Sequence, residues 1–247
     1  MDSLFLETNQ YGLLLEGALI TIQILVYSFL LGVVLSLIFG VARLSERRWV
    51  RGLAFGYVEF ARGISSIVLL FVIAIAIPIL LDVGQASLIL LGSIALGLNM
   101  GGYGAEIVRG AIQAVPKGQT EATIALNLTP TQRLRYVILP QAMRIILPPM
   151  GNLTIEILKG TALVSLVGLT DLLQQTRNVR QQQVAAGAAS TADLTFLFVN
   201  TLLIYFVLAQ VVATLFRYFE RRLEGRYEAR NEPLPADIAA PHVGGAA

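Results

Sequence analysis

The sequence has no cysteine and only one histidine among its 247 residues. Without cysteine, neither a disulfide framework nor a thiolate metal site can form. The single histidine, His242, lies in the last few residues of the chain, away from every apolar run. These absences exclude most metal sites and most histidine-dependent catalytic schemes. We therefore expect no catalytic residues, no bound metal and no cofactor in this chain.

Charge is also scarce, because 14% of the residues are charged whereas soluble domains carry about 25%. The mean hydropathy is +0.71, and 55% of the residues are apolar. A net charge of +2 is too small to indicate nucleic acid. The amino-terminal stretch is acidic and polar, unlike a cleavable signal peptide. The composition predicts an all-α, polytopic membrane protein.

Five runs are long and apolar enough, or nearly so, for a membrane helix, which needs about 20 such residues. They are residues 18–42, 64–81, 86–105, 145–169 and 194–216. The helix of the second run is expected to begin earlier, near Phe55. The third run is rich in glycine, as expected where helices approach closely. The fourth is broken by Pro148 and Pro149. We predict five transmembrane helices.

The positions of lysine and arginine predict the orientation, since these residues favour the cytoplasmic side. Most of them follow the first, third and fifth runs, whereas only Arg177 and Arg180 follow the fourth. Residues 1–17 are then an extracytoplasmic segment, 18–222 the membrane domain and 223–247 a cytoplasmic tail with too little apolar bulk to pack. Residues 217–230 fit a helix end at the lipid headgroups or a solvated extension equally well.

A polar segment, residues 111–140, separates the third and fourth runs on the predicted cytoplasmic side. Its sequence predicts a short helix from Gln119 that Asn127 ends, because asparagine tolerates the left-handed conformation of a sharp helix end. Such a segment suits either a docking surface or an amphipathic helix on lipid.

A second short helix is expected to start at Pro130. Thr129 and Gln132 have the spacing of a capping box around a proline in the first helical position. Leu139 and Pro140 are expected to close this helix before the chain enters the membrane again.

This segment resembles the loop shared by permease subunits of ABC importers. The matching positions are Glu121, Ala122, Thr123, Asn127, Val137, Leu139 and Pro140. Thr123 replaces an alanine, Val137 an isoleucine and Asn127 a glycine of that pattern. The resemblance covers roughly residues 12–222 and points to the polar amino-acid branch. It implies the type I importer permease architecture and a loop that couples to the ATPase.

The resemblance also implies the partners. The chain lacks the G-x-x-x-x-G-K-[ST] pattern of a P-loop, so ATP hydrolysis is expected on a separate ATPase subunit. An extracytoplasmic solute-binding protein and a second permease, identical or homologous, complete the expected importer in a bacterial inner membrane. The alternatives are an ATP-independent channel and a structural subunit of a membrane complex. The chain has no evident internal repeat or filter-like pattern.

Ionisable residues inside apolar runs are functional candidates, because an unpaired charge in the bilayer is costly. Arg62, Glu156 and Lys159 are such residues, although Glu156 and Lys159 are three apart and could neutralise each other. Asn99, Asn152 and Thr161 could add to a translocation path or hold helices together.

Two runs, residues 102–110 and 159–166, look more like permeases for ectoine and hydroxyectoine, and Arg62 is followed by Gly-Ile-Ser where many amino-acid permeases have Gly-Thr-Pro. The solute expected from this resemblance is an amino acid or one of these zwitterionic derivatives.

Overall fold

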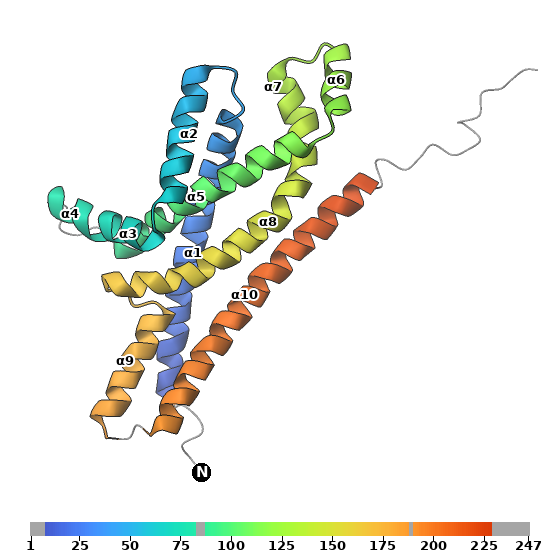
Figure 1. Cartoon of the computed structure of the whole chain (residues 1–247). Helices are drawn as coiled ribbons and strands as arrows, with labels where there is room; N and C mark the ends of the chain where they lie inside the picture. The colour runs from blue at the N-terminus through green and yellow to red at the C-terminus, as the bar shows by residue number, and fades with distance from the viewer. Residues whose placement is uncertain (1–7, 83–86, 188–189, 229–247) are drawn as a thin grey trace, which may run out of the picture.

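The computed structural model describes residues 8–82, 87–187 and 190–228, and every regular element within these ranges is helical. The elements in chain order are α1 (Thr8–Ala42), α2 (Arg48–Gly63), α3 (Ser66–Phe71), the π-helical η2 (Val72–Ala76), α4 (Ile77–Leu80), α5 (Leu88–Ala114), α6 (Lys117–Ala125), α7 (Pro130–Arg133), the π-helical η3 (Leu134–Ile138), α8 (Leu139–Gly160), the 3-10 helix η4 (Thr161–Val167), α9 (Leu172–Ala185) and α10 (Thr191–Glu228). The short pair α6 and α7 lies at one end of the molecule, and α9 at the other (Figure 1).

The centre of the fold is the packing of α1 and α2 against the glycine-rich helix α5. A Cβ atom on Gly97 would lie 2.9 Å from Leu31 of α1, and one on Gly102 would lie 2.6 Å from the Cβ of Ala61 of α2. Only glycine leaves room for neighbours this close. The prediction that the third apolar run admits close helix contacts is confirmed.

Four helices are long and apolar enough to cross a membrane, and a bent helix pair can supply a fifth span. The pair joins α2 to the α3–α4 segment at an angle of 101°. The prediction of one helix from near Phe55 through residue 81 was therefore wrong. Ile64 and Ser65 adopt extended conformations, with ψ angles of 140° and 132°, and separate the two halves.

A side chain from α5 holds this bend. The Asn99 side-chain amide donates to the carbonyl of Ala61 at 2.9 Å, and its oxygen accepts from the Ser66 hydroxyl at 3.1 Å. Asn99 is buried, and it joins the end of α2 to the beginning of α3. Its hydrogen bonds satisfy polar groups that the helix break would otherwise leave without partners.

The second short helix does not end at Leu139 and Pro140, contrary to the sequence prediction. The chain runs from Pro130 to Val167 as one 38-residue helical span. The π-helical turn η3 lies before Pro140, and the Leu139 N–H bonds the Leu134 carbonyl five residues earlier. This wider turn accommodates a proline, whose ring clashes in a regular helix with the carbonyl four residues before it.

Pro148 and Pro149 also lie inside α8 without ending it. Proline has a helical φ angle, and it is tolerated in a membrane helix where neighbours or local adjustments satisfy the backbone. The break expected in the fourth run is therefore absent from the described helix.

The amino-terminal segment contains more helix than the sequence predicted, whereas helix through residue 228 agrees with both interpretations of residues 217–230. Helix α1 begins at Thr8, within the segment predicted to precede the membrane domain. Helix α10 continues to Glu228, so the boundary expected at residue 223 falls inside a helix. The remainder of the predicted tail, residues 229–247, lies outside the described residues.

Helix α9, which the sequence analysis did not predict, begins at a buried carboxyl group. Asp171 accepts a hydrogen bond from the backbone N–H of Gln174 at 3.0 Å, and the Tyr205 hydroxyl of α10 donates to it at 3.3 Å. Burial raises the pKa of Asp171, although these hydrogen bonds and the charge of Arg177 act in the opposite direction. The ionised Asp171 carboxylate is therefore less stable in the folded protein than in water.

This raised pKa predicts a pH-dependent stability. The unfolded pKa is about 3.9, and the group's contribution is greatest below that value and declines as pH rises through the higher folded pKa. Asp171→Asn keeps a capping oxygen but removes the titration. Thermal unfolding in detergent should show the wild-type Tm falling, relative to that of Asp171→Asn, between acidic and neutral pH. Parallel pH profiles of Tm for the wild type and Asp171→Asn would contradict the prediction. Asp171→Ala should lower the free energy of unfolding by about 1 kcal/mol, because the cap is lost.

Candidate functional site

The polar segment forms a helix–turn–helix at one end of the fold (Figure 1). Helix α6 ends at Ala125, and Asn127, two residues later, has a left-handed φ angle of 54°. The N–H of Leu128 reaches back to the Thr123 carbonyl at 3.0 Å and satisfies one of the last carbonyls of α6. The predicted left-handed helix end at Asn127 is confirmed.

The start of α7 is a capping box, also as predicted. The Thr129 hydroxyl accepts from the Gln132 N–H at 3.4 Å, and the Gln132 side-chain oxygen accepts from the Thr129 N–H at 3.0 Å. Pro130 occupies the first turn, where its missing N–H leaves no hydrogen bond unmade. Local side-chain chemistry therefore fixes the angle between the two short helices.

The outer surface of this helix pair is accessible and partly apolar. Glu121 and Ala122 of α6 are exposed, whereas the Thr123 side chain is buried and bonds the Thr120 carbonyl. Two apolar side chains that the sequence analysis did not assign to the site, Ile124 and Leu126, are 54% and 74% exposed. Exposed apolar side chains in a projecting helical segment are typical of a docking surface.

The projecting segment is continuous with the membrane helices. Leu139 and Pro140 form the first turn of α8. In the same turn, the Gln141 side chain donates to that of Gln119 at 3.1 Å, which ties α6 to α8. A displacement of α6 would thus act directly on α8.

Three of the predicted path residues share one face of α8. Asn152, Glu156 and Lys159 follow one another at spacings of four and three, and all three side chains are exposed. No ion pair joins Glu156 to Lys159 among the described residues. The face thus presents an amide, an acid and a base along an otherwise apolar span.

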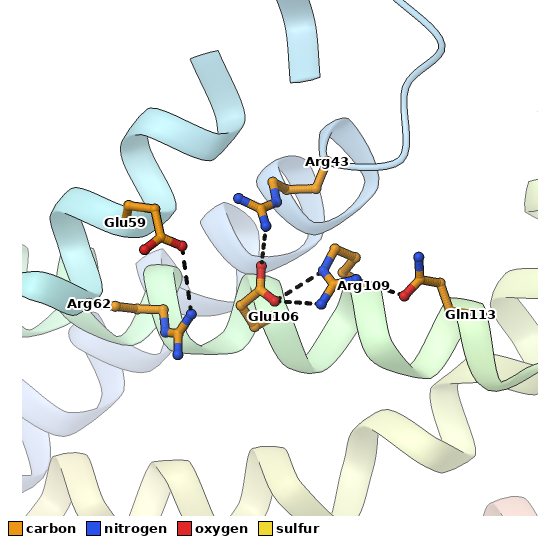
Figure 2. Close-up of polar contacts among 6 residues, drawn as sticks. All are labelled: Arg43, Glu59, Arg62, Glu106, Arg109 and Gln113. Atoms are coloured by element: carbon orange, nitrogen blue, oxygen red, sulfur yellow. Dashed lines mark hydrogen bonds and ion pairs between the residues drawn. The ribbon is translucent and has the colours of Figure 1, made fainter. Parts of the chain in front are cut away.

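The other predicted path residues lie elsewhere. Thr161 is completely buried, and its hydroxyl donates to the Leu158 carbonyl at 2.7 Å. Asn99 holds the bend between α2 and α3. Arg62, at the end of α2, is half-exposed and lies 3.9 Å from Glu59 (Figure 2). Its guanidinium group also stands over the ring of Tyr103. Asn152, Glu156 and Lys159 therefore share one exposed face, whereas Thr161 and Asn99 are buried and Arg62 lies on α2.

A charged cluster links the end of α1 to α5, and the sequence analysis did not identify it (Figure 2). The Glu106 carboxylate lies 3.2 Å from Arg43 and 2.7 Å from Arg109, and Arg109 donates in turn to Gln113 at 2.7 Å. The spacing of Glu106 and Arg109 was visible in the sequence. Their contact with Arg43 depends on the tertiary packing of α1.

Comparison with known proteins identifies the family. Residues 5–225 match the family described as the binding-protein-dependent transport system inner membrane component. The chain belongs to this family. It is therefore a transmembrane permease of an ATP-driven importer, and it is a multi-pass membrane protein as the sequence predicted. Membership of this family gives the chain the role of a transport subunit.

Relatives with assigned names match along most of the chain. A probable amino-acid ABC transporter permease of Sinorhizobium fredii is 42% identical and covers 85% of this chain and 86% of its own length. The L-cystine transport system permease TcyB of Bacillus subtilis is 33% identical, with 91% and 92% covered. The histidine/lysine/arginine/ornithine transport system permease HisQ of Salmonella typhimurium is 37% identical, with 85% and 93% covered.

Solved structures share the fold. An amino acid ABC transporter with histidines superposes with a TM-score of 0.73 at 32% identity, covering 86% of this chain and 94% of that one. The inward-facing MetNI methionine transporter has a TM-score of 0.71 at 19% identity and covers 88% and 99%, which concerns the fold alone. The predicted type I importer permease architecture is confirmed.

Proposed function

We propose that this permease imports polar amino acids across a bacterial inner membrane. The observation that carries the proposal is the exposed face of α8, where an acid and a base, Glu156 and Lys159, lie three residues apart in an apolar span. An α-amino acid is a zwitterion, and one anionic and one cationic side chain suit its two charges. The names of the relatives favour this solute class, whereas ectoine and hydroxyectoine stay predictions from the resemblance.

A second permease is part of the proposal because the polar face of α8 cannot remain in lipid. A charge within the bilayer costs at least about 2.5–3.5 kcal/mol unless it pairs or faces a cavity. Pairing with an identical or homologous permease would place Asn152, Glu156 and Lys159 along a shared path.

The ATPase partner is assigned to the α6–α7 segment, with Glu121, Ala122, Thr123 and Asn127 as coupling residues. Leu139 and Pro140 would transmit the movement into α8. Exposed Ile124 and Leu126 suit a groove on a separate ATPase subunit, and an extracytoplasmic binding protein would deliver the solute. The ATPase must have different affinities for the two permease states, because equal affinities would leave the equilibrium between these states unchanged.

The orientation is proposed with the amino terminus outside and the carboxyl terminus in the cytoplasm. The connection between α1 and α2, the α6–α7 segment and the carboxyl end of α10 all lie toward one end, and α9 lies toward the other (Figure 1). The first three of these segments are rich in arginine. This distribution agrees with the preference of arginine and lysine for the cytoplasmic side.

The function is tested by reconstituting this permease with its genomic-neighbour ATPase and binding protein. Polar amino acids, ectoine and hydroxyectoine are screened for stimulation of ATP hydrolysis and for uptake into liposomes. At least one polar amino acid should raise hydrolysis and be accumulated only when ATP is present. Uptake by the permease alone would instead favour the channel alternative, and stimulation by ectoine alone would reassign the solute.

A further inference from the structure

A cavity of about 340 Å³ lies where the end of α1 meets α2 and α5. Its lining residues are Arg43, Leu44, Arg48, Arg51, Gly52, Phe55, Arg109 and Gln113. Four guanidinium groups thus face one small space, close to the charged cluster in Figure 2. None of the residues proposed above for ATPase coupling or for the solute path lines this cavity.

The cavity has an excess of positive charge. Glu106 is the carboxylate that contacts its arginines, and it is engaged by both Arg43 and Arg109. Among the described residues, Arg48 and Arg51 form no ion pair. The Nη1 atom of Arg43 is buried, and no group in the described residues forms a hydrogen bond with it. Arginine forks are suited to phosphate oxygens, since they offer paired donors in a fixed plane.

The amino terminus of α2 adds to this positive field. Arg47 occupies the capping position and makes no side-chain hydrogen bond to the helix. The first N–H groups of a helix have no partner within it, and with the helix dipole they favour an anion. Arg48 and Arg51 stand on this first turn, so backbone and side-chain donors lie together.

An apolar stripe lies beside the cavity on the outer face of α2. Trp49, Leu53 and Phe60 recur at helical spacing and are 65%, 68% and 60% exposed. Trp49 is the only tryptophan in the sequence. Tryptophan concentrates where a membrane meets water, and large exposed apolar side chains on a spanning helix suit acyl chains.

We propose that this cavity binds the phosphate headgroup of an anionic phospholipid, whose acyl chains lie along the Trp49–Leu53–Phe60 stripe. A soluble phosphate would use the arginines but would have no need of the stripe, so the stripe favours the lipid. The site belongs to the cytoplasmic leaflet, which rests on the proposed orientation. Basic pockets between membrane helices on that side suit acidic lipid headgroups.

The fluorescence of Trp49 offers a direct test, because no other tryptophan of the permease contributes. The full-length permease is placed in nanodiscs that contain the same small fraction of brominated phosphatidylglycerol or brominated phosphatidylcholine. Bromine quenches tryptophan on contact. Stronger quenching by the phosphatidylglycerol is expected for the wild type, with an apparent affinity at least about tenfold higher for the acidic lipid. Equal quenching by the two lipids would overturn the proposal.

Two pairs of substitutions test whether the arginines of the cavity produce the preference for the acidic lipid. Arg48→Gln with Arg51→Gln should remove the preference for phosphatidylglycerol. Arg221→Gln with Arg222→Gln makes the same charge change at exposed positions of α10 and should preserve it. The proposal fails if the first pair retains the preference or the second pair loses it. Loss of the preference in inorganic phosphate, but not in chloride of equal ionic strength, would identify a soluble anion as the ligand instead.

Native mass spectrometry of the permease assembled with its ATPase distinguishes a lipid site from a protein contact. Wild-type complexes should retain phosphatidylglycerol, and complexes with Arg48→Gln and Arg51→Gln should lose it. If the lipid binds the isolated permease but leaves on assembly, the importer does not retain it, and the proposal is overturned for the assembled complex. Solute-stimulated hydrolysis in the same complexes tests the importer separately, because a failed lipid site leaves that activity in place.

Discussion

Replacing Leu126 by glutamate is expected to abolish binding of the ATPase while leaving the permease folded. The Leu126 side chain is 74% exposed at the end of α6, so the substitution removes little packing within the chain. In a docked complex the side chain would be buried, and burial of a leucine contributes about 1.5–3 kcal/mol. A carboxylate buried without a partner would add a further cost. The affinity for the ATPase should therefore fall by more than about a hundredfold.

Co-purification with a tagged ATPase measures this loss, and the Tm of the permease in detergent checks that folding is intact. Val184→Glu is the matched control, since Val184 is 56% exposed but lies on α9 at the opposite end of the fold (Figure 1). It should leave the ATPase bound. Retained binding by Leu126→Glu would contradict the coupling role, and lost binding by Val184→Glu would contradict both the docking site and the orientation.

The features that the sequence predicted correctly depend on neighbours close along the chain. The apolar runs follow from composition, and four of the five overlap for most of their length with helices that could span a membrane. The left-handed Asn127 and the capping box between Thr129 and Gln132 are set within a few residues. Such interactions form between residues close along the chain, which is why the turn between the two short helices of the polar segment could be predicted from the sequence.

The features that escaped prediction depend on contacts between distant segments. The bend at Ile64 and Ser65 is held by Asn99, a side chain from another helix. Glu106 meets Arg43 only because α1 packs against α5. Rules that use only neighbouring residues in the sequence cannot predict these contacts.

The prediction that the helix ends at Pro140 was wrong for a different reason, because a local rule was applied without its exception. Proline usually ends a helix, but a π-helical turn before it lets the helix continue. The uninterrupted helix from Pro130 to Val167 joins the polar segment directly to the exposed polar face of α8.

The second large effect concerns that polar face. Glu156→Gln should reduce uptake by about tenfold or more, because a hydrogen bond to a charged group contributes about 1.5–3 kcal/mol and the solute's ammonium group would lose it. Lys159→Gln should reduce uptake by a similar factor, because the solute's carboxylate would lose its charged partner.

The double variant separates solute binding from simple neutralisation of one charge by the other. If the two residues serve only to neutralise each other, removing both should restore uptake towards that of the wild type. If each binds the solute, the double variant should be worse than either single one. Uptake into liposomes containing the complete importer measures the three variants, and Glu16→Gln, an exposed acid on α1, is the control that should transport normally. The absence of an ion pair between Glu156 and Lys159 in the described chain favours the second outcome, since two groups that face the same path without bonding each other remain available to a zwitterion.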